Sequence, residues 1–233
     1  MRLDKYLAEC NIGTRSEVKK HIKNKLVTVN EIVAQKPEMK IDENTDVICF
    51  KGKQILYEKY VYYLFHKPAG CVTAKTDNLH KTVMEYLGEE VKSDVSPVGR
   101  LDLDTEGLLI MTNDGPLLHH LLSPAHHIPK TYYAEVDAVI PQEAVALFEK
   151  GVDIGDDKPT LPAALEILSE TSANLTITEG RFHQVKRMFA AVGCNVTYLK
   201  RIKMGQLSLS DLPIGAYRRL TEEEILSLKN DNN

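Results

Sequence analysis

"GRLDLDTEGLLIMTNDG", residues 99–115, places three acidic side chains directly before an apolar run. The run at residues 107–112 predicts a buried strand, and residues 115–122 predict a helix after it. Carboxylates are seldom buried unless they are paired. The loop at residues 99–106 is therefore the first candidate for a functional site.

Two interpretations of these acids follow from the residues themselves. Asp102, Asp104 and Glu106 alternate and precede Gly107, like the start of an EF-hand calcium loop. The twelfth loop position is Asn113 where a bidentate Glu is needed, and apolar residues stand where polar ligands belong, so calcium is disfavoured. Alternatively, Asp102 and Asp104 share one face of a strand and act as a carboxylate pair at a sugar carbon.

The surrounding chain alternates between predicted strands and predicted helices. "KYVYYLFHKPAG", from Lys59, is a β-rich run that ends at Pro68 and Gly70. Further strands are predicted at residues 131–136, 164–168 and 174–178, and helices at residues 142–150 and 183–192. This mixture indicates an α+β domain over residues 59–233, preceded by a smaller domain over residues 1–58.

The smaller domain is predicted to contain two helices followed by a small sheet. "MRLDKYLAEC" places an apolar stripe at helical spacing, formed by Leu3, Tyr6, Leu7 and Cys10. In "TRSE", Thr14 and Glu17 form a capping box that starts a second helix. "LVTVN" and "DVICF" predict the strands.

The second helix separates apolar from cationic residues. Val18 and Ile22 lie on one face, and Arg15, Lys19 and Lys23 line another with Lys20 beside them. Residues 1–60 carry 12 basic and 9 acidic side chains, whereas the whole chain carries 29 and 33, for a net charge of −4. The cationic face is either simply solvated or binds an anionic partner.

Several classes of protein are disfavoured by composition. The cysteines form no C-x-x-C pair, which disfavours a zinc site or a disulfide framework; they are Cys10, Cys49, Cys71 and Cys194. Four histidines fit no zinc spacing, and no metal is expected there; they are His119, His120, His126 and His127. A charged N-terminus and the lack of any run of 18 apolar residues predict a cytoplasmic protein with no membrane span.

"RLDKYLAECNIGTRSEVKKHIKNKLVTVN" resembles the S4 RNA-binding module. The resemblance implies a helix pair that presents basic residues to RNA phosphates, namely Arg2, Lys5, Arg15, Lys19, Lys20 and Lys23. In that family glycine usually stands where this chain has Lys25 and Glu31, because glycine permits a left-handed turn. Such contacts supply affinity and little sequence choice, so the chemistry must lie elsewhere.

Three ordered motifs resemble the RsuA branch of the pseudouridine synthases: "GRLDLDTEGLLIMTNDG", "KTYYAEV" and "EGRFHQVKRMFAAVG". The resemblance implies a mixed, mainly antiparallel sheet flanked by helices. It makes Asp102 the catalytic carboxylate, with Lys186 as its cationic partner. Tyr132 would stack on the flipped uracil, and Tyr133 would point to the opposite side of the strand. Arg100 would position the RNA. A rigid, water-poor site would then explain a carboxylate beside a buried strand.

The same resemblance implies a substrate and excludes a cofactor. Isomerisation of uridine to pseudouridine needs no metal, cofactor or energy source. The expected partner is ribosomal RNA in a partly assembled small subunit, and a monomer is expected. A compact chain without a basic C-terminal extension favours the small subunit. Two alternatives stay open, a large-subunit enzyme of the same branch and a non-catalytic RNA-binding assembly factor.

Overall fold

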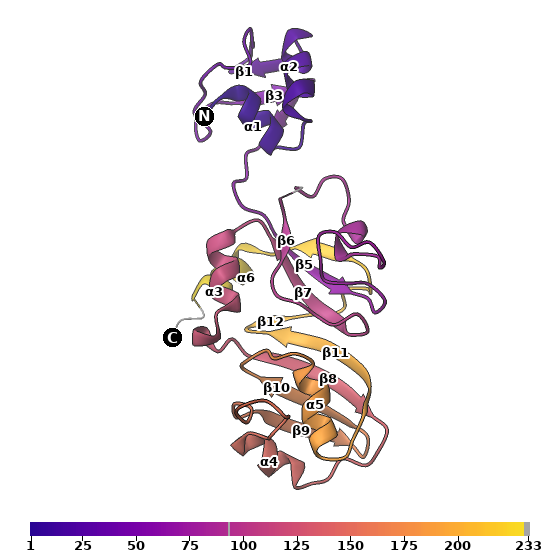
Figure 1. Ribbon diagram of the computed structural model, residues 1–233. Coiled ribbons are helices and arrows are strands. Elements are labelled where there is room, and N and C mark those ends of the chain that lie inside the picture. The colour runs from indigo at the N-terminus through magenta and orange to yellow at the C-terminus, as the bar shows by residue number, and fades with distance from the viewer. Residues whose placement is uncertain (93, 231–233) are drawn as a thin grey trace. The chain divides into compact units, whose positions relative to one another are not determined.

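The computed structural model describes residues 1–92 and 94–230, which form two compact units (Figure 1). The first unit contains Met1–Val61 together with Gly88–Val95. The second contains Tyr62–Leu87 and the chain from Ser96 onward. Within the part of the chain that is described, no helix combines the length and the apolar character needed to cross a membrane.

The first unit consists of helices α1 (Leu3–Glu9) and α2 (Arg15–Lys23) and a four-stranded sheet. The strand order is β2-β1-β3-β4, with bounds Ile32–Val33, Val27–Val29, Ile48–Phe50 and Lys53–Ile55. The predicted stripe of α1 is buried at Leu3, Tyr6 and Leu7, and Cys10 is only half-buried. The predicted capping box is present, since the Thr14 hydroxyl accepts from the Glu17 amide.

Two turns of this unit adopt left-handed backbone without glycine. Lys25, after α2, has φ +59°, and Glu31, between β1 and β2, has φ +67°. These are the positions at which the S4 resemblance calls for glycine. The turn geometry is therefore kept, and the non-glycine residues bear its steric cost.

The second unit is built on a nine-stranded sheet. Its main strand order is β13-β5-β7-β11-β8-β10-β9, with β6 beside β7 and β12 beside β11. The bounds are β5 Tyr62–Lys67, β6 Ser96–Pro97, β7 Glu106–Thr112, β8 Lys130–Val136, β9 Ala164–Ser169, β10 Ser172–Ile177, β11 Val196–Met204, β12 Leu207–Ser208 and β13 Tyr217–Arg219. All strand pairs are antiparallel except β7 with β11, so the prediction of a mixed, mainly antiparallel sheet is confirmed.

Helices surround this sheet. They are η1 Val83–Tyr86, α3 Gly115–Leu122, η2 Pro124–His126, α4 Ala144–Lys150, α5 Gln184–Ala191 and α6 Glu222–Asn230. Figure 1 shows α4 and α5 lying against the part of the sheet formed by β8 to β11. Phe148 of α4 and Phe189 of α5 meet edge to face, with ring centroids 5.8 Å apart, inside the buried cluster. This packing fixes α5 over one face of the sheet.

Most predicted elements lie within two residues of the observed ones, and the strand predicted from Lys59 begins three residues later, at Tyr62. The helix predicted from residue 142 begins at Ala144, and the one predicted from residue 183 begins at Gln184. His183 is the N-cap of α5 and has φ +46°. Strand β11 was not predicted, because its sequence "VTYLKRIKM" mixes cationic and apolar residues without clear alternation.

Candidate active site

Asp102 lies in the loop between β6 and β7 and not on a strand. The Thr105 amide donates to the Asp102 carbonyl at 3.1 Å, which closes a turn over these residues. The interpretation of Asp102 and Asp104 as a pair on one strand face is therefore wrong. The strand begins only at Glu106, since the turn comes first.

Hydrogen bonds from a side chain and a backbone amide of the segment after β5 hold this loop in place. The Thr73 hydroxyl donates to the Leu101 carbonyl at 2.9 Å and accepts from the Leu101 amide at 3.1 Å. The Gly70 amide donates to the Leu103 carbonyl at 2.8 Å. Leu101 and Leu103 are therefore tied on both sides of Asp102, and its carboxylate is carried on a rigid loop.

Lys67, the last residue of β5, is the strongest of these anchors. Its side chain is 0 % exposed, and Nζ donates to the carbonyls of Asp102 at 3.0 Å and Thr105 at 2.8 Å. It also reaches the carbonyls of Pro68 and Leu103. Burial lowers the pKa of Lys67. Sequence analysis missed this residue, because nothing in "FHKPAG" distinguishes a buried lysine from one that ends a strand in solvent.

The Asp102 carboxylate meets two basic side chains from the start of α5. Lys186 Nζ lies 3.4 Å from Oδ2, and His183 Nε2 lies 3.7 Å from Oδ1. Lys186 also donates to Asp104 Oδ1 at 2.6 Å. Burial raises the pKa of Asp104, but the hydrogen bond and charge of Lys186 outweigh it, so the net shift is downward. One ammonium thus serves two carboxylates, and the Asp102 side chain keeps 31 % exposure towards solvent.

Tyr132 belongs to a row of paired residues that crosses the sheet and includes Lys67, which lies under the loop of Asp102. Register pairs Lys67 with Gly107, Gly107 with Arg201, and Arg201 with Tyr132. Paired residues on neighbouring strands point to the same face, so these side chains share the face that carries α5. Tyr132 is buried in the same cluster as Leu101. Tyr133 lies on the other face as predicted, where its hydroxyl donates to Glu135.

Two cations on this face, Arg201 of the row and Lys130 two residues before Tyr132 on β8, were not predicted as site residues. Arg201 is 2 % exposed, and its Nε donates to the Leu108 carbonyl at 2.8 Å. Its Nη2 is buried without a hydrogen-bond partner. Burial, helped by the charge of Arg201, lowers the pKa of Lys130 to about 8. Positive charge is therefore concentrated on the face that carries Asp102.

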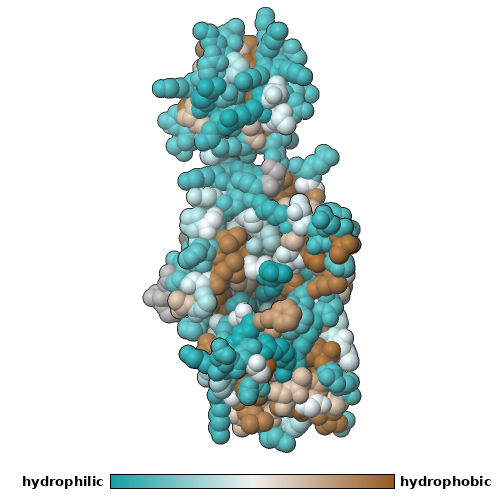
Figure 2. Space-filling view, viewed as in Figure 1, coloured by the Kyte–Doolittle hydropathy of each residue, from teal (hydrophilic) through white to brown (hydrophobic). Residues whose placement is uncertain are grey.

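Some of the predicted RNA-binding residues form ion pairs within the protein, and others do not. Arg15, Lys19, Lys20 and Lys23 are exposed, and none has an ion pair within 4.0 Å among the residues described. Arg2 is paired with Asp4 at 2.7 Å, and Lys5 lies 3.6 Å from Glu9. Arg100 is exposed at the start of the loop that carries Asp102. Hydrophilic side chains cover most of the first unit in the view of Figure 2.

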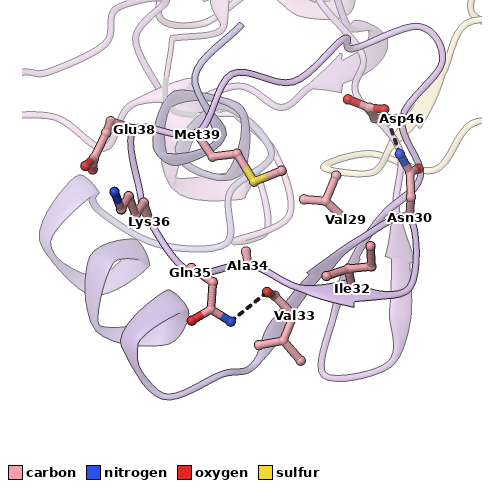
Figure 3. A pocket seen from close by; sticks show the side chains of 10 residues that line it. All are labelled: Val29, Asn30, Ile32, Val33, Ala34, Gln35, Lys36, Glu38, Met39 and Asp46. Carbon is pink, nitrogen blue, oxygen red and sulfur yellow. Dashed lines mark hydrogen bonds between the residues drawn. The ribbon is translucent and has the colours of Figure 1, made fainter.

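A cavity of about 520 Å³ lies in the first unit, beside β1 and β2 (Figure 3). Val29, Ile32 and Met39 contribute apolar side chains, and Asn30 donates to Asp46 at its edge at 2.8 Å. None of the predicted RNA-binding or catalytic residues lines it.

Two of the four histidines around α3 lie close together. The rings of His120 and His126 lie 3.9 Å apart, centroid to centroid. Across residues 1–92 and 94–230, no group of three or more His, Cys, Asp or Glu side chains is arranged to hold a metal ion.

Comparison with known families agrees with this architecture. Residues 61–191 match RNA pseudouridylate synthase, and residues 1–47 match the S4 domain. The chain belongs to the RNA pseudouridylate synthase family and is a pseudouridine synthase with an N-terminal S4 RNA-binding domain.

The relatives are similar over nearly the whole chain. It is 43% identical to the Uncharacterized RNA pseudouridine synthase YtzG of Bacillus subtilis (strain 168), covering 97% of each chain. It is 40% identical to the Ribosomal small subunit pseudouridine synthase A of Escherichia coli (strain K12), covering 98% of this chain and 100% of that one. A solved structure described as a pseudouridylate synthase superposes with a TM-score of 0.71 at 38% identity, over 98% of this chain and 99% of that chain.

Proposed function

We propose that this protein converts one uridine of small-subunit ribosomal RNA to pseudouridine, with Asp102 as the catalytic carboxylate. One observation carries the proposal. The Asp102 carboxylate lies 3.4 Å from the Lys186 ammonium, and the loop that carries Asp102 is held by Lys67 and Thr73. The names of the full-length relatives from Escherichia coli and Vibrio cholerae support the small subunit as substrate. The proposal includes action in the cytoplasm as a monomer on a partly assembled subunit.

The reaction breaks the N1–C1′ bond of uridine and forms a C5–C1′ bond after the uracil has rotated. The proton on C5 is lost, and N1 gains one, so no redox partner is needed. Asp102 either attacks C1′ or removes the C2′ proton to give a glycal, and both routes need an ionised carboxylate. The ammonium of Lys186 favours the ionised form and orients it.

The target uridine must leave its base stack before Asp102 can reach C1′, at a cost of a few kcal/mol. Tyr132 supports this step in the proposal, because its buried ring lies on the face that carries Asp102 and α5. A uracil stacked on Tyr132 recovers part of the cost of unstacking.

RNA affinity is assigned to the exposed cations of α2 and to Arg100. Binding should weaken steeply with salt, because each phosphate contact releases counterions. Replacing both Lys19 and Lys23 by Gln should reduce the slope of log affinity against log salt by roughly one to two. A matched control replaces Lys36 and Lys53, which are exposed off α2. An unchanged slope with the α2 variant would contradict this assignment.

The function is tested by carbodiimide-primed reverse-transcription mapping of pseudouridine. Small- and large-subunit ribosomal RNA are incubated with the protein, with Asp102→Asn, and with Asp211→Asn as an exposed control. We expect one new stop in small-subunit RNA that is lost only with Asp102→Asn. A stop in large-subunit RNA would overturn the substrate and keep the chemistry. No stop in naked RNA or in assembly intermediates would overturn the proposed function.

A further inference from the structure

Phe182 is an exposed aromatic ring that folding does not explain. The structure describes all 5 phenylalanines and 10 tyrosines, and among these Phe182 is the one that is exposed, at 76 %. It is absent from the buried cluster that holds α5 against the sheet. An aromatic ring left in water forgoes the burial that usually stabilises it.

This ring lies next to the proposed catalytic carboxylate. Phe182 stacks on His183 with centroids 3.8 Å apart and planes inclined by 18°. His183 Nε2 in turn lies 3.7 Å from Asp102 Oδ1. The two rings therefore form a short stack that starts at the carboxylate and ends in solvent.

The stack is held on a rigid turn. Arg187 Nη1 donates to the Phe182 carbonyl at 3.1 Å, and the Arg187 guanidinium also binds the Ile154 carbonyl and Asp156. The Arg181 amide donates to Gln184 Oε1 at 2.9 Å. Backbone on both sides of Phe182 is therefore anchored, and the ring is presented in a fixed place rather than on a loose loop.

A second exposed apolar residue neighbours Asp102 in the sequence. Leu103 follows Asp102 directly and is 39 % exposed, and its carbonyl is bound by Gly70 and Lys67. Apolar groups around a site for RNA cannot bind phosphate. They can bind the flat face of a base, because every base has one.

We propose that Phe182 and His183 form a stacking platform for an RNA base that neighbours the reacting uridine. This inference rests on the proposed function, since it takes Asp102 as the place where uridine reacts. When the uridine leaves its stack, a neighbouring base loses a stacking partner. The platform supplies a replacement close to Asp102 and keeps the strand open. Phe182 is thus a positioning residue for the RNA.

The first test uses the lack of tryptophan in this chain. Phe182→Trp creates a protein with a single tryptophan at the platform, and Leu168→Trp places one at another exposed apolar position, on β9. Each is titrated with an in vitro transcript of small-subunit ribosomal RNA. We expect RNA to quench the fluorescence of the tryptophan at position 182, with the same midpoint as RNA binding. Little quenching is expected for the tryptophan at position 168. Equal quenching at both positions, or none at position 182, would overturn the platform.

The second test measures single-turnover modification of the same transcript. Loss of one base–aromatic stack predicts a reduction of roughly 5- to 150-fold in the modification rate or RNA affinity of Phe182→Ala. Phe182→Tyr should keep the wild-type value, because the tyrosine ring can still stack on a base. A purely apolar contact would not require this result. Leu168→Ala should resemble wild type. Wild-type behaviour of Phe182→Ala would contradict the proposal.

Combining Phe182→Trp with Asp102→Asn separates this proposal from the proposed function. Quenching without modification is expected, because stacking does not need the carboxylate. If Asp102→Asn still modifies RNA while quenching persists, the assignment of Asp102 fails and base stacking at position 182 stands. If Asp102→Asn is inactive and Phe182→Ala is fully active, the platform fails and the proposed function stands.

Discussion

The buried ammonium of Lys67 lies directly against the backbone of Asp102, with Nζ 3.0 Å from its carbonyl oxygen. A lysine that is 0 % exposed normally needs a carboxylate partner, yet the hydrogen bonds described for this one all go to backbone carbonyls. Its place under the loop explains why a charge is kept there. It binds the peptide oxygen of Asp102 itself and those of Leu103 and Thr105 after it, and so sets the position of the carboxylate.

Lys67→Met should lower the modification rate by about 10- to 100-fold, because the loop loses its anchor and Asp102 moves away from its reacting position. RNA affinity should change little, since the exposed cations of α2 are untouched. Single-turnover modification and filter binding measure the two quantities. The control is Lys81→Met, which replaces a lysine that lies over the ring of Tyr86. Full activity of Lys67→Met would contradict the anchoring role.

Lys186→Met should lower the modification rate by about 100-fold, and Lys186→Arg should lose less than about 10-fold, because arginine keeps the cation beside Asp102. Lys186→Met should also raise the pKa of Asp104, because the hydrogen bond and charge of Lys186 are the largest of the contributions that lower it. Carbon NMR of the carboxyl groups measures this shift. Equal loss with Arg and Met would mean that geometry, and not charge, is the requirement.

Gly107→Ala should reduce the free energy of unfolding by at least about 3 kcal/mol. A Cβ at Gly107 would meet the Arg201 carbonyl oxygen at 2.2 Å, and φ there is +113°. Gly115→Ala is the matched control, because its Cβ meets nothing within 4 Å. Urea unfolding of both variants compares them. A Gly107→Ala protein as stable as wild type would show that β7 and β11 can separate at no cost.

Lys25→Gly should raise the free energy of unfolding of the first unit by about 0.5–1 kcal/mol, because glycine accepts φ +59° without steric strain. Lys19→Gly, at an exposed position inside α2, should lower it by about 1 kcal/mol. Thermal unfolding followed by circular dichroism measures both. The reverse order of the two variants would contradict the strain assigned to the turn.

Stability should rise with pH between about 8 and the ordinary lysine value because of Lys130, whose pKa is lowered to about 8. In that window the unfolded chain keeps a proton that the folded chain has released, so the free energy of unfolding increases. Lys130→Met should show a smaller increase than the wild type, because Lys67 also has a lowered pKa, and Lys150→Met, at an exposed position of α4, should keep the full increase. Urea unfolding at a series of pH values tests the difference.

Local patterns determined the elements whose residues carry their own signals. The capping box of Thr14 and Glu17 placed the start of α2, and the alternation of Tyr132 and Tyr133 placed them on opposite faces of β8. The contiguous motif around Asp102 marked the candidate site. Each of these signals depends on residues within a few positions of one another, so it can be recognised from the sequence alone.

Only the tertiary structure decided what surrounds the site. Strand β11 lies between β7 and β8 and parallel to β7, which brings Arg201 beside Gly107 and Tyr132. Lys186 is shared between Asp102 and Asp104, and Lys67 is buried under a loop more than thirty residues away. The physical reason is that a lysine's partners are set by which distant segments pack together. Periodicity along the chain describes which face is buried, but not what meets it there.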